Sequence, residues 1–103
     1  MDRDTELILI TPVMAADAYG IPQEGEPIRR SVFARVESVS RSEFFEAGRN
    51  GLSPDYKMTM FAYDYEGEKI VEYQGKRYAV YRTYLGRDDT LELYVQEEGR
   101  SNG

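Results

Sequence analysis

Short stretches in which apolar residues recur at every second position are the feature that most constrains the fold of this chain. In RRSVFARVESV, residues Val32, Ala34 and Val36 share one face, because successive side chains of a β-strand point to opposite faces. The other stretches with strand character are ELILIT before Pro12, DYKMTMFAYDY, IVEY, KRYAVYRTYL and TLELYVQ. The pair Gln74-Gly75 predicts a tight hairpin between IVEY and KRYAVYRTYL, because glycine adopts positive φ at no steric cost.

Turn signals between these strands predict an all-β fold in a single domain. The chain has 103 residues, which is too few to build a second hydrophobic core. Closing the strands into a barrel removes the exposed strand edges that favour aggregation. We therefore expect a small antiparallel β-barrel of the SH3-like or OB-like kind over residues 1–103. One short helix is expected in the loop between the second and third strands, and the first loop is expected to be long.

The first loop runs from Pro12 to Arg30 and contains three prolines and two glycines. Long segments without a hydrophobic period are usually functional or disordered. We expect loop 12–30 to be flexible and its residues Tyr19, Ile21 and Ile28 to contact a partner. At the other end of the chain, the polar residues 97–103 are expected to form a disordered tail.

A helix is predicted in SVSRSEFFEAG, between the second and third strands. With Ser40 as N-cap, Glu43 occupies the third helical position, which is the spacing of a reciprocal capping box. Either Gly48 or Gly51 offers the left-handed conformation that ends a helix. A capping box contributes about 1 kcal/mol, so it explains why a helix forms but not why one is needed.

Two adjacent phenylalanines in this helix, Phe44 and Phe45, leave two interpretations open. Adjacent residues lie about 100° apart around a helix, so the two rings cannot share one face. Both could cap an open end of the barrel as part of the core. Alternatively, the helix and its flanking glycines belong to a surface that partners engage or move, since aromatic side chains on loops are good contact anchors.

Composition excludes several classes of function. The formal net charge of -6 argues against a surface that clamps nucleic acid, which needs clustered Lys and Arg. The chain has no cysteine and no histidine, which excludes disulfides, thiolate zinc sites and the commonest general base. The longest apolar run, Leu7–Ile10, is far shorter than the roughly 20 residues of a membrane-spanning helix.

Close carboxylate pairs occur at Glu66 with Glu68 and at Asp88 with Asp89. Such pairs can run acid and base hydrolysis or hold a hard cation. Here they flank turn residues, where solvated acids are expected, and no calcium-loop spacing surrounds them. We therefore expect no enzymatic activity, no cofactor and no metal.

The nine tyrosines have two interpretations. They could form a stacking platform for single-stranded nucleic acid, or they could pair across strands and stabilise the barrel. A stacking groove also carries basic residues, and this acidic chain favours the second interpretation.

About two thirds of the chain, from Val32 to Tyr94, resembles the bacteriophage head-tail joining proteins, also called head closure or stopper proteins. The matching text is VFARVESVSRSEFFEAG, then DYEGEKIVEYQGKRYAVYRTY, then LELYV. In that family the order is a strand, a short helix with a Ser/Arg-x-Glu-aromatic start, a strand, a hairpin through glycine and an aromatic-rich strand. No single element is specific, and the resemblance rests on order and spacing.

The resemblance implies a barrel that assembles as a ring, dodecameric in the virion, below the portal and adaptor proteins and above the tail. The location implied is the virion neck, and the host cytoplasm during assembly, with the gene carried by a phage or prophage. DNA would pass through the channel without sequence-specific binding, and no membrane is involved. The helix-bearing excursion would close the channel, a role that falls on Ser40 to Ser53. Its candidate residues are Ser40, Glu43, Phe44, Phe45, Gly48 and Gly51.

Two other classes of function stay open. An SH3-like peptide-binding module would use the tyrosines as a groove. A small hydrolase would use Glu66 or Asp88, and this is the weaker alternative.

Overall fold

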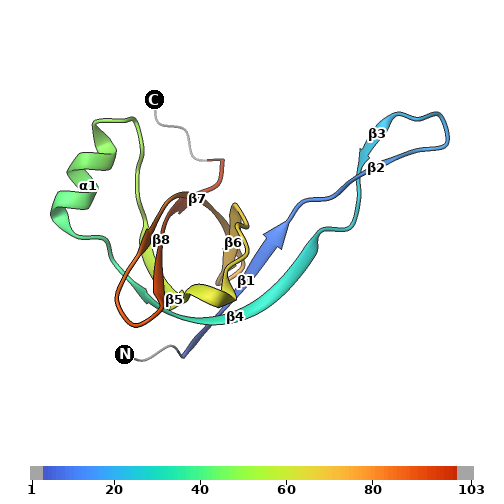
Figure 1. Cartoon of the computed structure of the whole chain (residues 1–103). Coiled ribbons are helices and arrows are strands. Elements are labelled where there is room, and N and C mark those ends of the chain that lie inside the picture. The colour runs from blue at the N-terminus through green and yellow to red at the C-terminus, as the bar shows by residue number, and fades with distance from the viewer. Residues whose placement is uncertain (1–3, 100–103) are drawn as a thin grey trace.

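Six antiparallel strands close into a barrel in the order β1-β4-β5-β8-β7-β6, as Figure 1 shows. The structure is a computed structural model that describes residues 4–99. The barrel strands are β1 (Thr5–Thr11), β4 (Ile28–Glu37), β5 (Tyr56–Phe61), β6 (Ile70–Tyr73), β7 (Lys76–Leu85) and β8 (Thr90–Glu97). One α-helix, α1 (Arg41–Gly48), lies between β4 and β5. The predicted small all-β barrel with one short helix is confirmed.

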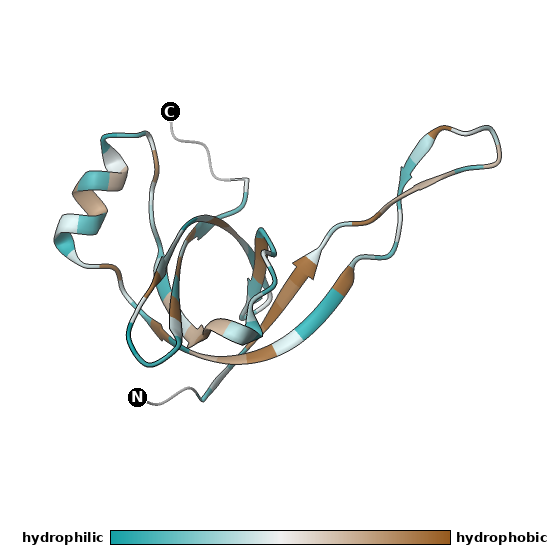
Figure 2. Ribbon diagram, in the orientation of Figure 1, coloured by the Kyte–Doolittle hydropathy of each residue, from teal (hydrophilic) through white to brown (hydrophobic). Residues whose placement is uncertain are grey.

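Every strand of the barrel contributes to one hydrophobic core. Its fully or nearly fully buried members are Leu7, Leu9, Val32, Ala34, Met58, Met60, Val71, Tyr78, Leu93 and Val95. The predicted inward face of β4 is confirmed, because Val32 and Ala34 are buried and Val36 packs against the core. The alternation in the sequence therefore corresponds directly to inside and outside. Figure 2 shows β1 as continuously hydrophobic, because its apolar run does not alternate.

Two tight turns carry the left-handed residues that their geometry requires. Gln74 and Gly75 both have positive φ, at 52° and 76°, which is the pattern of a two-residue hairpin of type I′. In the turn between β7 and β8, Asp88 and Asp89 also have positive φ, and the backbone N–H of Gly86 donates to the carbonyl of Thr90 at 2.8 Å. Aspartate tolerates this region better than most residues.

The third predicted strand ends earlier than expected. The alternation in DYKMTMFAYDY suggested a strand through Tyr63, but β5 stops at Phe61 and Ala62–Asp64 form the short 3-10 helix η1. The backbone N–H of Ala62 turns to the carbonyl of Asp89 at 2.7 Å, and the guanidinium of Arg30 donates to the carbonyl of Asp64 at 2.8 Å. These contacts outside the β5 ladder provide partners for the backbone and bend it away from the strand.

The expectation of a first loop without regular structure is wrong. Within residues 12–30, β2 (Met14–Ala16) pairs with β3 (Pro22–Glu24), and β4 already begins at Ile28. Residues 12–13 enter this hairpin and residues 25–27 leave it, so the two connections differ by one residue. Pro12 and Pro27 lie in these two connections, between the β1–β4 pair and the hairpin. Proline has no backbone N–H, so the ladder of hydrogen bonds is interrupted there.

We call residues 12–27 the arm, because they project away from the barrel (Figure 1). The radius of gyration is 15.2 Å, whereas a compact domain of this length has about 13 Å. The arm accounts for this excess, and it lies on the opposite side of the barrel from α1 (Figure 1).

The disordered tail was predicted from residue 97, but the ordered chain continues past that residue. Glu97 is the last residue of β8, and its backbone N–H donates to the carboxylate of Asp55 at 2.7 Å. The backbone N–H of Glu98 donates to the carbonyl of Arg77 at 2.9 Å. Residues 100–103 lie outside the described residues.

Candidate partner-binding surfaces

The predicted N-cap of α1 is confirmed. The hydroxyl oxygen of Ser40 accepts a hydrogen bond from the backbone N–H of Glu43 at 3.1 Å, which provides a partner for one of the free donors of the first turn. At the other end, Gly51 has φ of +77°, whereas Gly48 is still helical. The backbone N–H of Leu52 returns to the carbonyl of Ala47 at 3.1 Å. Of the two candidate stop residues, Gly51 is thus the left-handed one.

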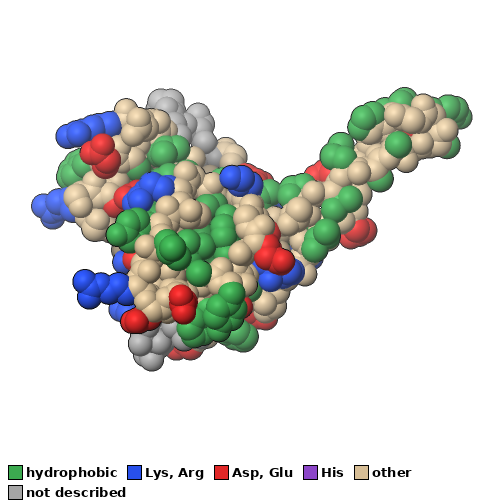
Figure 3. Space-filling view, viewed as in Figure 1, with side chains coloured by type: hydrophobic (Ala, Val, Ile, Leu, Met, Phe, Trp, Pro, Cys, Tyr) green, Lys and Arg blue, Asp and Glu red, His purple; other side chains and the backbone are tan. Residues whose placement is uncertain are grey.

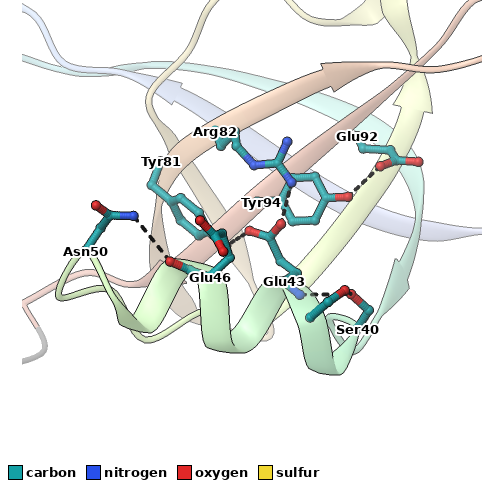
Figure 4. Close-up of polar contacts among 9 residues, drawn as sticks. Ser40, Glu43, Glu46, Asn50, Tyr81, Arg82, Glu92 and Tyr94 are labelled. Carbon is teal, nitrogen blue, oxygen red and sulfur yellow. Dashed lines mark hydrogen bonds and ion pairs between the residues drawn. The ribbon is translucent and has the colours of Figure 1, made fainter.

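The carboxylate of Glu43 contacts the barrel, so the predicted reciprocal capping box is only half formed. Figure 4 shows Glu43 pointing from α1 toward β7. Its Oε2 accepts from the hydroxyl of Tyr81 at 2.7 Å, and its Oε1 pairs with the guanidinium of Arg82. The side chain of Glu43 is 13% exposed. Hydrogen bonds of this kind, between a charged acceptor and partly buried donors, are stronger than neutral ones.

Beyond Arg82 the network continues onto β8. The guanidinium carbon of Arg82 lies 4.1 Å from the centroid of the Tyr94 ring, within the range of a cation–π contact. The hydroxyl of Tyr94 donates to the carboxylate of Glu92 at 2.6 Å (Figure 4). Burial and the neighbouring Glu92 carboxylate raise the pKa of Tyr94 to about 12. Burial and the bond to Glu43 likewise raise the pKa of Tyr81 well above its ordinary value.

A second attachment fixes the return from α1 to β5. The backbone N–H of Ser53 donates to the side-chain oxygen of Gln96 at 2.9 Å, and that of Asp55 donates to the carbonyl of Val95 at 2.9 Å. Ala47 lies between the Glu43 contacts and this return segment, and it is the one buried residue of the helix. The helix is therefore held against the barrel through its inner face.

Both phenylalanines lie on the solvent side of α1, about 100° apart around the helix; we call this side the outer face. Phe44 is 50% exposed and Phe45 is 62% exposed, and their rings meet edge to face with centroids 6.0 Å apart. The interpretation of both residues as caps of the barrel core is therefore wrong, because the position facing the barrel belongs to Ala47. Beside the two rings lies an open hollow of about 480 Å³, lined also by Val39, Arg41 and Pro54.

The other predicted contact residues lie on the arm, except Ile28, which is the first residue of β4. Tyr19 is 89% exposed, and Ile21 and Ile28 are more than half exposed. The carboxylate of Asp17 organises the tip, because its Oδ1 accepts from the backbone N–H groups of Tyr19 at 2.8 Å and Ile21 at 2.9 Å. The N–H groups of Ile21 and Tyr19 lower the pKa of Asp17. Gly20, with φ of +78°, completes the turn.

Sequence reasoning missed three features of these surfaces. Tyr81 and Arg82 both donate to Glu43. They are adjacent in sequence, and the register of β7 with β8 shifts between Val80 and Arg82, an irregularity that the period of the strand does not predict. Met14 on the arm is exposed. A second apolar patch joins Phe33 of β4 to the stacked rings of Phe61 and Tyr63, whose centroids lie 5.1 Å apart. The outward position of Phe33 in the alternation was the available signal for this patch.

The carboxylate pairs form no cluster of metal ligands within residues 4–99. Glu68 is buried and pairs with Arg30 at 2.6 Å, and Glu66 pairs with the same guanidinium at 2.9 Å. Burial disfavours the charged form of Glu68, but its bonds from backbone N–H groups and Arg30 outweigh burial and lower its pKa. Within residues 4–99, no three Asp or Glu side chains gather as metal ligands would.

Several tyrosines pack on one another inside the fold. The rings of Tyr56 and Tyr73 meet edge to face at 5.3 Å, and those of Tyr56 and Tyr78 at 5.5 Å. These three residues come from β5, β6 and β7, so the interpretation as pairs that stabilise the barrel is supported. Across the described part of the chain, no helix has the length and apolar character needed to cross a membrane.

The sequence was compared with models of known protein families and with curated proteins, and neither comparison finds a match. The resemblance to head-tail joining proteins therefore stays a prediction from the order and spacing of the elements.

Proposed function

We propose that this protein is a structural component of the neck of a tailed bacteriophage, a head-tail connector or stopper without enzymatic activity. It assembles as a ring below the portal and adaptor proteins, retains the packaged DNA and provides the surface on which the tail docks. The DNA passes through the ring without sequence-specific binding. The structure itself establishes the fold, which is a small β-barrel with one helix.

The observation that carries the proposal is the division of the molecule into a closed barrel and two exposed excursions. The core lies inside the barrel, whereas the arm and the outer face of α1 carry large apolar side chains in solvent. Figure 3 shows hydrophobic side chains distributed along the arm and at its tip. Exposed apolar groups on two separate protrusions are typical of a subunit that contacts several neighbours. The helix also lies between the two strands where the family resemblance puts it.

The charge of the protein favours a channel through which DNA passes rather than a surface that binds DNA. The chain carries a net charge of -6, so its surface as a whole repels a polyanion. Five of the eight arginines within residues 4–99 pair with carboxylates, among them Arg29 with Glu72 at 2.8 Å and Arg30 with two glutamates. A groove built to hold DNA would instead leave clustered cations free.

The experiment that tests the proposal is deletion of the gene from the phage or prophage that carries it, followed by negative-stain imaging of the lysate. We expect DNA-filled heads without tails, and loss of DNA from those heads on storage. A plasmid copy of the gene should restore tailed particles. Normal infectious virions from the deletion strain would overturn the proposal.

The alternative, a peptide-binding module, gives a different result in the same strain and in solution. Such a protein would be a monodisperse monomer with a saturable ligand among short peptides, and its loss would leave particle structure intact. The packing of Tyr56, Tyr73 and Tyr78 against one another leaves fewer tyrosines for such a groove.

A further inference from the structure

The arm is a folded hairpin with no fully buried residue. All residues of β2 and β3 are exposed, and each of these two strands has a single neighbour, so both outer edges of the hairpin are unpaired. A two-stranded hairpin without a packed face is marginally stable in water. Its three paired positions and the Asp17 turn fix its shape, but its apolar side chains face solvent. This arrangement is suited to a segment that completes its packing on another molecule.

Chemically, the arm is apolar and acidic. Its large exposed apolar residues are Met14, Tyr19 and Ile21. Residues 12–27 contain three carboxylates, Asp17, Glu24 and Glu26, and no lysine or arginine. A surface that covers the arm should therefore offer exposed apolar or aromatic side chains together with an uncompensated positive charge.

The outer face of α1 has these two properties. Phe44 and Phe45 lie beside the open hollow, which Arg41 and Asp55 also line. The carboxylate of Asp55 accepts from the backbone N–H of Glu97 at 2.7 Å. Arg41 is exposed and forms no ion pair with any residue in the range 4–99. Glu43, the acid nearest in sequence, is occupied by Tyr81 and Arg82 on the inner side. The outer face of α1 thus combines aromatic rings with a free cation.

We propose that the arm of one copy docks on the outer face of α1 of the next copy. The arm cannot reach the helix of its own chain, because the two lie on opposite sides of the barrel (Figure 1). Each copy therefore offers one arm and one acceptor face. A contact between two different patches is heterologous, and repeated from copy to copy it gives a ring when the rotation between copies closes and a filament when it does not. This contact specifies how neighbouring copies would meet in the proposed neck protein, and its closure into a ring rests on that proposed function.

A cross-linking experiment on the purified protein tests the contact directly. The chain has no cysteine, so only introduced thiols react with a short bismaleimide. Ala18→Cys labels the arm tip beside Tyr19, and Ser42→Cys labels the first turn of α1, and both positions are exposed. The variant carrying both changes should form a ladder of dimers, trimers and longer multimers in concentrated solution. Each single variant should not extend beyond a dimer.

Matched controls separate this contact from random collision. A variant with Ala18→Cys and Arg87→Cys carries its second thiol on the exposed turn between β7 and β8, which lines neither the arm nor the hollow beside α1, and should give no ladder. Adding Tyr19→Ser and Ile21→Ser, or Arg41→Glu, to the reactive pair should abolish the longer multimers. Circular dichroism and thermal melting of each variant verify that the barrel is folded.

A ladder from the arm and helix pair no longer than that of the Arg87 control would overturn the inference. That result would leave the deletion phenotype of the heads unaffected, so the neck function would stand while this contact fails. Conversely, a specific ladder together with normal virions from the deletion strain would retain the contact and reject the neck function.

Discussion

Helix α1 and the arm both present aromatic side chains to solvent, but they are attached to the barrel in different ways. The helix is held through Glu43, Ala47 and the return segment near Ser53, so one face is committed to the barrel. The arm continues from the stem formed by β1 and β4, and none of its strand residues is buried. The free energy of folding is therefore concentrated in the barrel and the inner side of α1, whereas the arm contributes little to it.

The largest expected contrast is between two apolar side chains on one continuous stretch of chain. Leu9 is fully buried in the barrel, whereas Met14, five residues later on the arm, is 64% exposed. Leu9→Ala should lower the free energy of unfolding by about 2–5 kcal/mol through lost contacts and a cavity. Met14→Ala should change it by less than about 0.5 kcal/mol. Urea denaturation followed by circular dichroism measures both, and similar losses would show that the arm packs on the barrel.

Much of the barrel could be predicted from the sequence, because its strands alternate and its turns contain the residues that positive φ requires. The inward direction of Val32 and Ala34 and the turn at Gln74-Gly75 depend on residues that are adjacent or two apart in the sequence. The hairpin of the arm could not be predicted in this way. Its strands are three residues long and contain Pro22, so neither hydrophobic period nor strand propensity marks them. The signal that was present is the Asp17 turn with Gly20.

The candidate site shows the same limit. Ser40 as N-cap is a local property and was predictable from spacing. The partner of Glu43 was not, because the choice between the helix backbone and Tyr81 depends on how α1 is placed against β7. The exposure of Phe44 and Phe45 was open for the same reason, since the sequence fixes the angle between them but not which side meets the barrel.

The second largest contrast lies within α1, between Glu43 and Glu46. Glu43→Ala leaves the hydroxyl of Tyr81 and the guanidinium of Arg82 without their acceptor, which should cost about 1–3 kcal/mol of folding free energy. Glu46 is mostly exposed and its side chain pairs with the exposed Arg49 at 3.2 Å, so Glu46→Ala should cost less than about 0.5 kcal/mol. Equal effects in chemical denaturation would mean that Glu43 contributes only as part of the helix cap.

A smaller effect on the free energy of unfolding is expected in alkaline solution, where Tyr94 of the network between α1 and the barrel titrates. The pKa of Tyr94 is raised to about 12 in the folded protein, whereas an unfolded tyrosine ionises near 10. Between these values the unfolded state has lost a proton that the folded state keeps, so the free energy of unfolding falls as pH rises. Tyr94→Phe removes this group, and its unfolding free energy should decline less steeply over the same range. Parallel alkaline slopes for the two proteins in urea titrations would contradict the assignment.

The smallest effect on stability is expected for the outer face of α1. Changing Phe44 and Phe45 together to Ser removes two rings that are at least half exposed and keeps Ala47 and Glu43 in place, so the melting temperature should stay close to that of the parent. The same double variant should fail to replace the parent gene in the head assay, because the arm of the neighbouring copy loses its acceptor. Ser42→Ala, an exposed change on the same helix, is the matched control and should support tail joining. Cooperative loss of folding in the phenylalanine variant would return these rings to the core, whereas a folded variant that joins tails normally would place the docking surface elsewhere on the barrel.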